Sequence, residues 1–222
     1  MDNRLNEVLR VTEIFKSIQG ESSWAGLPCV FVRLTGCPLR CSYCDTAYAY
    51  EGGTEMTIGE IIEQCVGLGG SLVEVTGGEP LFQEACPVLV HYLLERRFTV
   101  LVETSGALPI TGLPRKAIRI MDLKCPGSGM SGKNHWDNIE ALAPHDEVKF
   151  VIGDRADYEW SRDILKKYNL KDRCQEVLFA PAHGILEPQV LAEWILEDAL
   201  EVRFQLQIHK HIWPEGRQGG PA

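Results

Sequence analysis

Short hydrophobic runs recur along the chain and alternate with stretches of helical periodicity. Most of the runs are nearly continuous and rich in valine, isoleucine and phenylalanine, which is typical of strands buried on both faces of a parallel sheet. They predict strands at 29–34, 72–77, 99–105, 118–123, 147–152, 176–181 and 202–208. Between them, the pattern predicts helices at 57–67, 85–97, 157–168 and 187–199, the last three with charged outer faces.

The predicted helix at 57–67 has the clearest start signal. Thr57 and Glu60 have the spacing of a capping box, in which each side chain bonds the backbone N–H of the other residue. Helical spacing predicts one apolar face made of Ile61, Ile62, Cys65 and Val66.

Repeated strand–helix alternation over the whole length predicts a single α/β domain at 1–222, without an internal linker, low-complexity tract or repeat. About six such units are too few for a closed eight-stranded barrel, so we expect a partial, open (β/α) barrel with modified helices, or a wound sheet. In both, functional groups gather at the carboxyl ends of the parallel strands. The Gly/Pro-rich end of the tail at 211–222 is predicted to be disordered.

Composition and charge narrow the class of protein. The chain has 222 residues, of which 45% are hydrophobic and 24% charged, as is ordinary for a globular protein with a large core. Its net charge of −9 argues against broad binding to nucleic acid or anionic membranes, but not against a local basic pocket. We see no secretory signal and no run near the ~18 apolar residues of a membrane span, so we expect a cytoplasmic protein.

The chain contains eight cysteines, which fall into two groups. Five are scattered, mostly within apolar runs, and are interpreted as small buried hydrophobes: Cys29, Cys65, Cys86, Cys125 and Cys174. The other three, Cys37, Cys41 and Cys44, lie together in the segment 35–48, directly after a predicted strand.

Four kinds of site are compatible with these three thiols. Structural disulfides are disfavoured in a reducing cytoplasm. A structural zinc site needs four ligands, usually in two pairs, and no second Cys-x2-Cys is present; His209 and His211 are close together but far downstream. A thiol redox centre would use Cys41 and Cys44 but leave Cys37 idle. An iron–sulfur cubane normally takes four thiolates, so three would leave one iron open to a chelating small molecule.

The spacing Cys-x3-Cys-x2-Cys, with Tyr43 just before the last cysteine, resembles the signature of the radical S-adenosylmethionine (SAM) enzymes. The resemblance implies a [4Fe-4S] cluster on Cys37, Cys41 and Cys44, whose open iron binds the amino and carboxylate groups of SAM. In that family, reductive cleavage of SAM gives a 5′-deoxyadenosyl radical that removes a hydrogen atom from the substrate.

Polar motifs also follow the next strands, at 76–80, 103–106 and 122–124. Each alone is an ordinary strand end, but beside the cysteine loop they resemble the SAM-binding motifs of the family, including its GGE turn. The resemblance implies that SAM is bound by Tyr43, Asp45, Gly78, Glu79, Glu103, Ser105, Asp122, Leu123, Lys124 and Pro181.

A narrower resemblance covers most of the chain. The stretch FKSIQGESSWAGLPCVFVRLTGCPLRCSYCDTAY resembles the opening of the 7-carboxy-7-deazaguanine synthases. Further matches follow in order at Thr76–Glu79, Glu103-Thr104 and Gln207-x-His209-Lys210. The resemblance implies the ring contraction of 6-carboxy-5,6,7,8-tetrahydropterin to 7-carboxy-7-deazaguanine with loss of ammonia, in queuosine and 7-deazapurine biosynthesis.

This resemblance also implies roles for individual residues, with no catalytic group beyond the radical carried by the cofactor. Arg33 suits the substrate carboxylate through bidentate pairing, and Thr46 would help hold Mg²⁺. The implied substrate contacts are Ile18, Gln19, Gly20, Glu21, Arg33, Thr76, His209 and Ala222. The implied partners are a flavodoxin or ferredoxin-type reductant and a second copy of the chain in a homodimer. We expect binding neither to nucleic acid nor to a membrane.

Two segments depart from the pattern of that family. Twelve residues follow Lys210, where the family can place its terminal carboxylate at the substrate, and the segment 179–183 lacks a Gln-Pro pair beside the adenine, although Pro181 aligns. Two alternatives stay open from the sequence: a glycyl-radical activating enzyme, which shares the cysteine spacing, and a zinc-binding interaction module.

Overall fold

The computed structural model describes residues 3–213, in which one nine-stranded open sheet has the order β3-β1-β2-β4-β5-β6-β7-β8-β9. β1 pairs antiparallel with β2 and β3, whereas β2 and all strands from β4 to β9 pair parallel. The strands are β1 (Val8–Ile18), β2 (Pro28–Leu34), β3 (Thr54–Thr57), β4 (Leu72–Gly77), β5 (Thr99–Thr104), β6 (Ile118–Asp122), β7 (Glu147–Ile152), β8 (Glu176–Pro181) and β9 (Arg203–Phe204).

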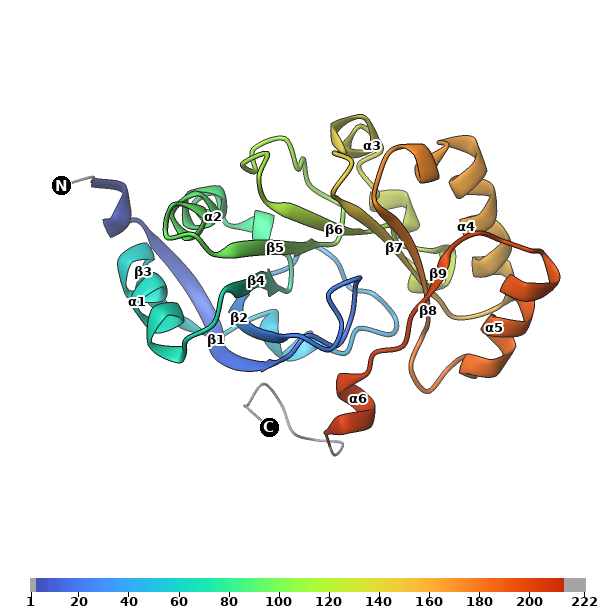
Figure 1. Cartoon of the computed structure of the whole chain (residues 1–222), viewed down its shortest axis with the longest axis horizontal. Coiled ribbons are helices and arrows are strands. Elements are labelled where there is room, and N and C mark those ends of the chain that lie inside the picture. The colour runs from blue at the N-terminus through green and yellow to red at the C-terminus, as the bar shows by residue number, and fades with distance from the viewer. Residues whose placement is uncertain (1–2, 214–222) are drawn as a thin grey trace.

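The helices cover the outer face of this sheet. Figure 1 shows α1 and α2 beside its first half and α4 and α5 beside its second half. The α-helices of the described residues are α1 (Ile58–Leu68), α2 (Cys86–Glu95), α3 (Asn138–Ala141), α4 (Arg155–Lys167), α5 (Pro188–Glu197) and α6 (His209–Ile212). None of these helices has the length and hydropathy needed to cross a membrane.

Strand alternation separates the core from the functional face. On β4, Val73 and Val75 belong to the main hydrophobic cluster beneath the helices, while Glu74 and Thr76 line a cavity on the other face. β7 behaves likewise, because Phe150 is in the same cluster and Lys149 lines the cavity. Successive side chains of a strand point to opposite faces, so each strand contributes both to the core and to the site.

The predicted open α/β architecture is confirmed, and the predicted strands from 29 to 181 all form. Each of the four predicted helices is present with ends that shift by one or two residues. At α1, the Thr57 hydroxyl accepts from the Glu60 N–H at 3.2 Å, and the Glu60 carboxylate accepts from the Thr57 N–H at 2.8 Å. The capping box read from the sequence is therefore present.

Three predictions about the elements were wrong or incomplete. The strand expected at 202–208 is only Arg203–Phe204, because the following glutamines point toward the loop after β1 and bond there, and α6 begins soon after. On α1, Val66 is 52% exposed and Ile58 takes its place in the core. β1 and β3 were not predicted, since their charged residues interrupt the hydrophobic runs.

Candidate active site

One cavity of about 750 Å³ opens at the carboxyl ends of the parallel strands. Residues from β2, β4, β5, β6 and β7 line it, together with the loop after β1 and the segment around α6. The predicted site residues that line it are Ile18, Gln19, Gly20, Glu21, Arg33, Cys37, Cys41, Tyr43, Cys44, Asp45, Thr46, Thr76, Gly78, Glu103, Ser105, Asp122, Lys124 and His209. A smaller hollow near the start of β8 contains none of the predicted residues.

The cysteine loop is held against the segment that follows β6 and against the end of β7. The Ser42 hydroxyl donates to the Gly127 carbonyl at 2.7 Å, and the Tyr43 hydroxyl donates to the Val151 carbonyl at 3.0 Å. Within the loop, the Arg40 guanidinium donates to the carbonyl of Cys37 at 2.8 Å and stacks over the ring of Tyr50. These bonds give the loop a defined shape although it has little regular secondary structure.

The three clustered thiols are free and partly buried, and all face the cavity. Burial raises the pKa of Cys37 and of Cys41, so both are protonated thiols at neutral pH until a metal displaces the proton. Within residues 3–213, no three His, Cys, Asp or Glu side chains converge on one point that would hold a single ion. Three thiols spread around one wall fit an iron–sulfur cube, whose irons take their thiolates at separate corners.

The turn after β4 approaches the cysteine loop closely at Gly78. A Cβ at this position would lie 2.5 Å from the Gly36 carbonyl oxygen and 2.8 Å from the Cys37 Cβ. The Glu79 N–H donates to the same carbonyl at 2.8 Å. Only glycine therefore lets the backbone of this turn lie against the first cysteine.

Glu79 itself is fully buried and does not line the cavity. Its carboxylate accepts hydrogen bonds from the Leu81 N–H at 2.9 Å, the Ser105 N–H at 2.7 Å and the Thr104 hydroxyl at 2.9 Å. Burial raises its pKa although these donors favour the charged form. Glu79 thus joins the turns after β4 and β5, and its side chain is not among the groups that face the cavity.

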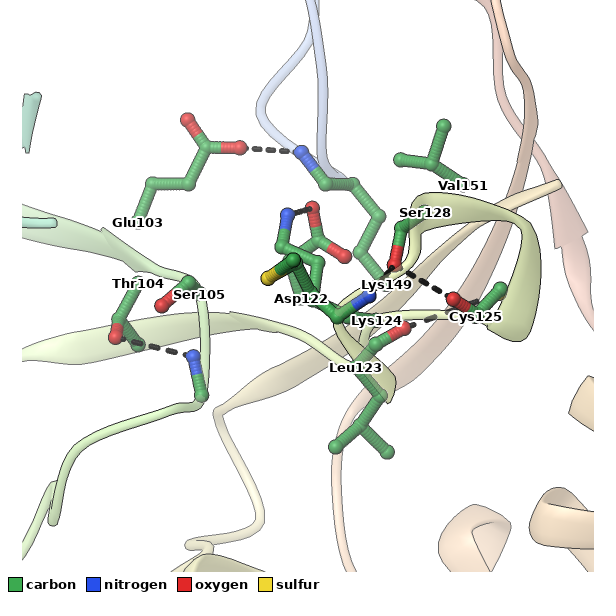
Figure 2. A network of polar contacts seen from close by, with 12 residues as sticks. Glu103, Thr104, Ser105, Asp122, Leu123, Lys124, Cys125, Ser128, Lys149 and Val151 are labelled. Carbon is green, nitrogen blue, oxygen red and sulfur yellow. Dashed lines mark hydrogen bonds and ion pairs between the residues drawn. The ribbon is translucent and has the colours of Figure 1, made fainter. Parts of the chain in front are cut away.

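Asp122 and Lys124 follow β6 and face the cavity as a pair. Figure 2 shows the Lys124 ammonium beside the Asp122 carboxylate, and the Lys124 Nζ lies 2.7 Å from the Asp122 Oδ2. Burial opposes the charge on Lys124, but Asp122 and Cys41 raise the pKa of its ammonium overall. The other carboxylate oxygen of Asp122 is buried and has no hydrogen-bond partner among the described residues.

The neighbouring wall, formed by residues of β5, β7 and the loop after β1, carries several carboxyl groups and one cation. The Lys149 ammonium pairs with Glu103, as Figure 2 shows, and donates to Glu21 at 2.8 Å. Gln207 also donates to Glu21, at 2.8 Å. Burial disfavours the Glu21 carboxylate, but Lys149 and His209 offset this and lower its pKa. The wall therefore presents acceptor oxygens toward the cavity.

Arg33 faces the cavity from β2 and is anchored on one side. The Arg33 Nε donates to the Glu13 carboxylate at 2.7 Å. The same carboxylate accepts from the Tyr48 hydroxyl at 2.9 Å. The guanidinium lies 5.8 Å above the centre of the Tyr48 ring. This leaves a fixed guanidinium with further N–H groups for an anionic ligand.

The segment around α6 covers the cavity from the far end of the chain. His209 packs on Gly20, where a Cβ would lie 2.1 Å from the His209 Nδ1. Burial lowers the pKa of His209, so its imidazole is neutral near pH 7. The Lys210 ammonium lies 2.6 Å from the Asp45 carboxylate, which also accepts from the Thr46 hydroxyl at 2.9 Å.

Residues 31–173 match the model of the radical SAM superfamily. The chain is 45% identical, over 95% of its length and 100% of the relative's, to a 7-carboxy-7-deazaguanine synthase of Koribacter versatilis. It is 46% identical to the 7-carboxy-7-deazaguanine synthase of Chlorobaculum tepidum, over 94% of this chain and 96% of that one. The chain belongs to the 7-carboxy-7-deazaguanine synthase family of radical SAM enzymes.

A solved structure has the same architecture as this member of the synthase family. QueE from Escherichia coli superposes with a TM-score of 0.74, covering 90% of this chain and 93% of that chain at 20% identity. At that identity the likeness supports the fold. The cofactors that the superfamily implies are a [4Fe-4S] cluster and SAM, and the three free thiols beside the cavity fit the cluster.

Some residues that the two resemblances implied lie outside the cavity lining. The side chains of Glu79, Leu123 and Pro181 are buried and do not line the cavity; Leu123 is part of the main core. Ala222 lies outside the described residues.

Other residues of the site were missed by sequence reasoning. They are Glu13, Tyr48, Glu74, Lys149 and Gln205, of which Glu74 and Lys149 are charged residues inside predicted strands. A charge within an otherwise apolar strand was the available signal, because such a residue needs a partner or a cavity on one face of the sheet.

Proposed function

We propose that this chain binds 6-carboxy-5,6,7,8-tetrahydropterin in the cavity and contracts its ring to 7-carboxy-7-deazaguanine, with loss of ammonia. One observation carries the proposal: the cysteine loop and the residues suited to a pterin line the same cavity. The identity to curated synthases over nearly the whole chain supports it.

Two sets of side chains that line the cavity suit two groups of this substrate. Arg33, anchored by Glu13, provides a planar cation for the pterin carboxylate. Gln19, Glu21 and Thr76 also line the cavity and would bind the amide and amino edge, where the ring has N–H donors and a carbonyl acceptor. A substrate held at both poles has one orientation, which is what a reactive radical intermediate requires.

The cysteine loop and the residues beside it in the cavity would hold the cofactors. Cys37, Cys41 and Cys44 would bind the cluster, and when reduced the cluster supplies the electron that cleaves SAM to a hydrogen-abstracting radical. Gly78 lets the turn after β4 lie against the cysteine loop, and Asp122, with one unpaired carboxylate oxygen, lines the same cavity. Ser105 and Lys124 also line the cavity and offer a hydroxyl and an ammonium to the cofactors.

A magnesium ion near Thr46 belongs to the same proposal. The Thr46 hydroxyl and the Asp45 carboxylate lie side by side at the cavity. Mg²⁺ keeps several waters and takes few protein oxygens, so one hydroxyl beside a substrate carboxylate is a suitable set of ligands. A flavodoxin or ferredoxin-type reductant and a homodimeric state complete the proposal.

The experiment that tests the function is anaerobic turnover. Cluster-loaded protein receives SAM, Mg²⁺, dithionite and 6-carboxy-5,6,7,8-tetrahydropterin, and the deazapurine is measured by mass and absorbance. Cleavage of SAM without the deazapurine would keep the superfamily assignment and reject the substrate. An intact cluster that cleaves no SAM would reject the enzyme mechanism.

A matched pair of cysteine variants ties the activity to the loop. Cys37→Ala should lose iron, sulfide and product together. Cys65→Ala removes a thiol from the core side of α1, away from the cavity, and should keep the cluster and the activity.

A further inference from the structure

Glu74 is a buried carboxyl group at the cavity to which the synthase resemblance assigns no role. It lies on β4, is 3% exposed, and points to the cavity between Gln19 and Glu103. Its hydrogen-bond partner in the described structure is the Nε2 of Gln19. Lys149, the cation of this wall, pairs with Glu21 and Glu103.

The contact with Glu74 determines how the Gln19 amide is oriented. The Oε1 of Gln19 accepts from the Glu21 N–H at 3.0 Å, and its Nε2 donates to Glu74. The N–H donor defines the oxygen end of the amide, and a carboxyl oxygen defines the nitrogen end. Because both contacts oppose rotation by half a turn, the amide has one orientation.

This orientation leaves specific groups of Gln19 for a ligand. Nε2 keeps one unused N–H and Oε1 keeps one unused lone pair, both on a side chain that is 3% exposed and lines the cavity. A neighbouring donor and acceptor are complementary to a ring lactam, which offers a carbonyl next to an N–H. A rotated amide would exchange the two and lose that match.

The surroundings of Glu74 favour a neutral carboxyl in this role. Burial raises its pKa well above the ordinary value, and the nearby charges of Glu103 and Glu21 raise it further. A neutral carboxyl accepts from Gln19 without adding a third negative charge to the wall. Glutamine at position 74 would supply the same acceptor oxygen.

We propose that Glu74 is a positioning residue for the substrate: through Gln19 it determines which edge of the pterin ring the cavity accepts. The proposal rests on the proposed function and deepens it. Glu74→Gln should keep the affinity for 6-carboxy-tetrahydropterin within about threefold. Glu74→Met removes the acceptor for the Gln19 Nε2 and should weaken pterin affinity about tenfold. The affinity for SAM should not change in either variant.

The binding experiment uses cluster-loaded protein with SAM and without reductant, and measures pterin binding by anaerobic calorimetry. Gln19→Met and the double variant Gln19→Met with Glu74→Met complete the cycle. If Glu74 acts through Gln19, the double variant binds no more weakly than Gln19→Met alone. Additive losses would overturn the proposal. Glu147→Gln is the matched control, because Glu147 is buried and holds the same loop through Ser23, outside the cavity.

A second measurement does not depend on the pterin. The side-chain amide signals of Gln19 are assigned by their absence in Gln19→Met, and their exchange with water is followed by NMR. Slow exchange in the wild type and Glu74→Gln, with fast exchange in Glu74→Met, is expected; unchanged exchange would overturn the proposal. If the wild type binds no pterin while these signals respond as expected, the proposed function fails and the positioning of Gln19 by Glu74 stands.

Discussion

The Lys210 ammonium and the Asp45 carboxylate lie 2.6 Å apart, although 165 positions separate them in the chain. The pair joins the segment that carries His209 to the residue after the last clustered cysteine. Closure of the cavity at this end is therefore coupled to the cysteine loop.

Lys210→Met should release the segment around α6 from the cysteine loop. Asp45 is half exposed in this pair, so the free energy of unfolding should fall by at most about 1 kcal/mol. Pterin affinity should fall several-fold, because His209 loses its fixed position, and SAM affinity should fall less, because Asp45 loses one partner but stays on the cysteine loop. Calorimetry with each ligand checks this split; equal losses for both ligands would contradict it.

Lys149→Met should be strongly destabilising. It leaves the partly buried carboxylates of Glu21 and Glu103 without their shared, buried cation, a change expected to lower the free energy of unfolding by about 3 kcal/mol. Urea unfolding of the reduced apoprotein measures this loss. Adding Glu103→Gln should recover part of it, because one of the uncompensated charges is removed.

The control for this prediction is Lys171→Met. Lys171 pairs with Glu201 on the surface, where both side chains are exposed, so the change should be worth less than about 1 kcal/mol. Similar losses in the two lysine variants would show that the Lys149 contacts do not stabilise the fold as inferred.

Gly78→Ala should disturb the cysteine loop through its backbone. The added Cβ meets the Gly36 carbonyl and the Cys37 Cβ, which have little freedom to move, and overpacking of this kind costs about 1–3 kcal/mol. We expect a lower iron content after reconstitution and weaker SAM binding. Gly132→Ala, where the Cβ would meet no atom within 4 Å, should leave both unchanged.

Glu74→Gln should change how stability depends on pH. The raised pKa of Glu74 means that the folded protein keeps this proton above pH 4.5, where the unfolded chain loses it. Wild-type stability therefore decreases as pH rises through this window, by up to about 1.4 kcal/mol per pH unit from this group. Glu74→Gln lacks this pH-dependent contribution, because a glutamine side chain does not titrate.

Urea midpoints at pH 5, 6, 7 and 8 test the prediction for Glu74. The stability of Glu74→Gln relative to the wild type should increase with pH across this series. Glu63→Gln, at an exposed position of α1, controls for loss of one carboxylate at the surface. A constant difference between Glu74→Gln and the wild type would contradict the raised pKa.

Local patterns were sufficient for most of the fold and for the cofactor half of the site. The parallel strands appear as apolar runs because their core faces pack beneath helices, and Thr57 with Glu60 marks a helix start through contacts three residues apart. The three cysteines lie within one loop, so their spacing reports a shared ligand without knowledge of the tertiary structure.

The other half of the site depended on contacts between distant segments. Lys149 on β7 meets Glu21 from the loop after β1, 128 positions away, and Glu74 meets Gln19 across 55 positions. Sequence spacing carries no information on such pairs, because the sheet order brings their strands and loops together. The residues that bind through local spacing were readable from the chain, whereas those that position one another across the cavity were decided by the order of the strands in the sheet.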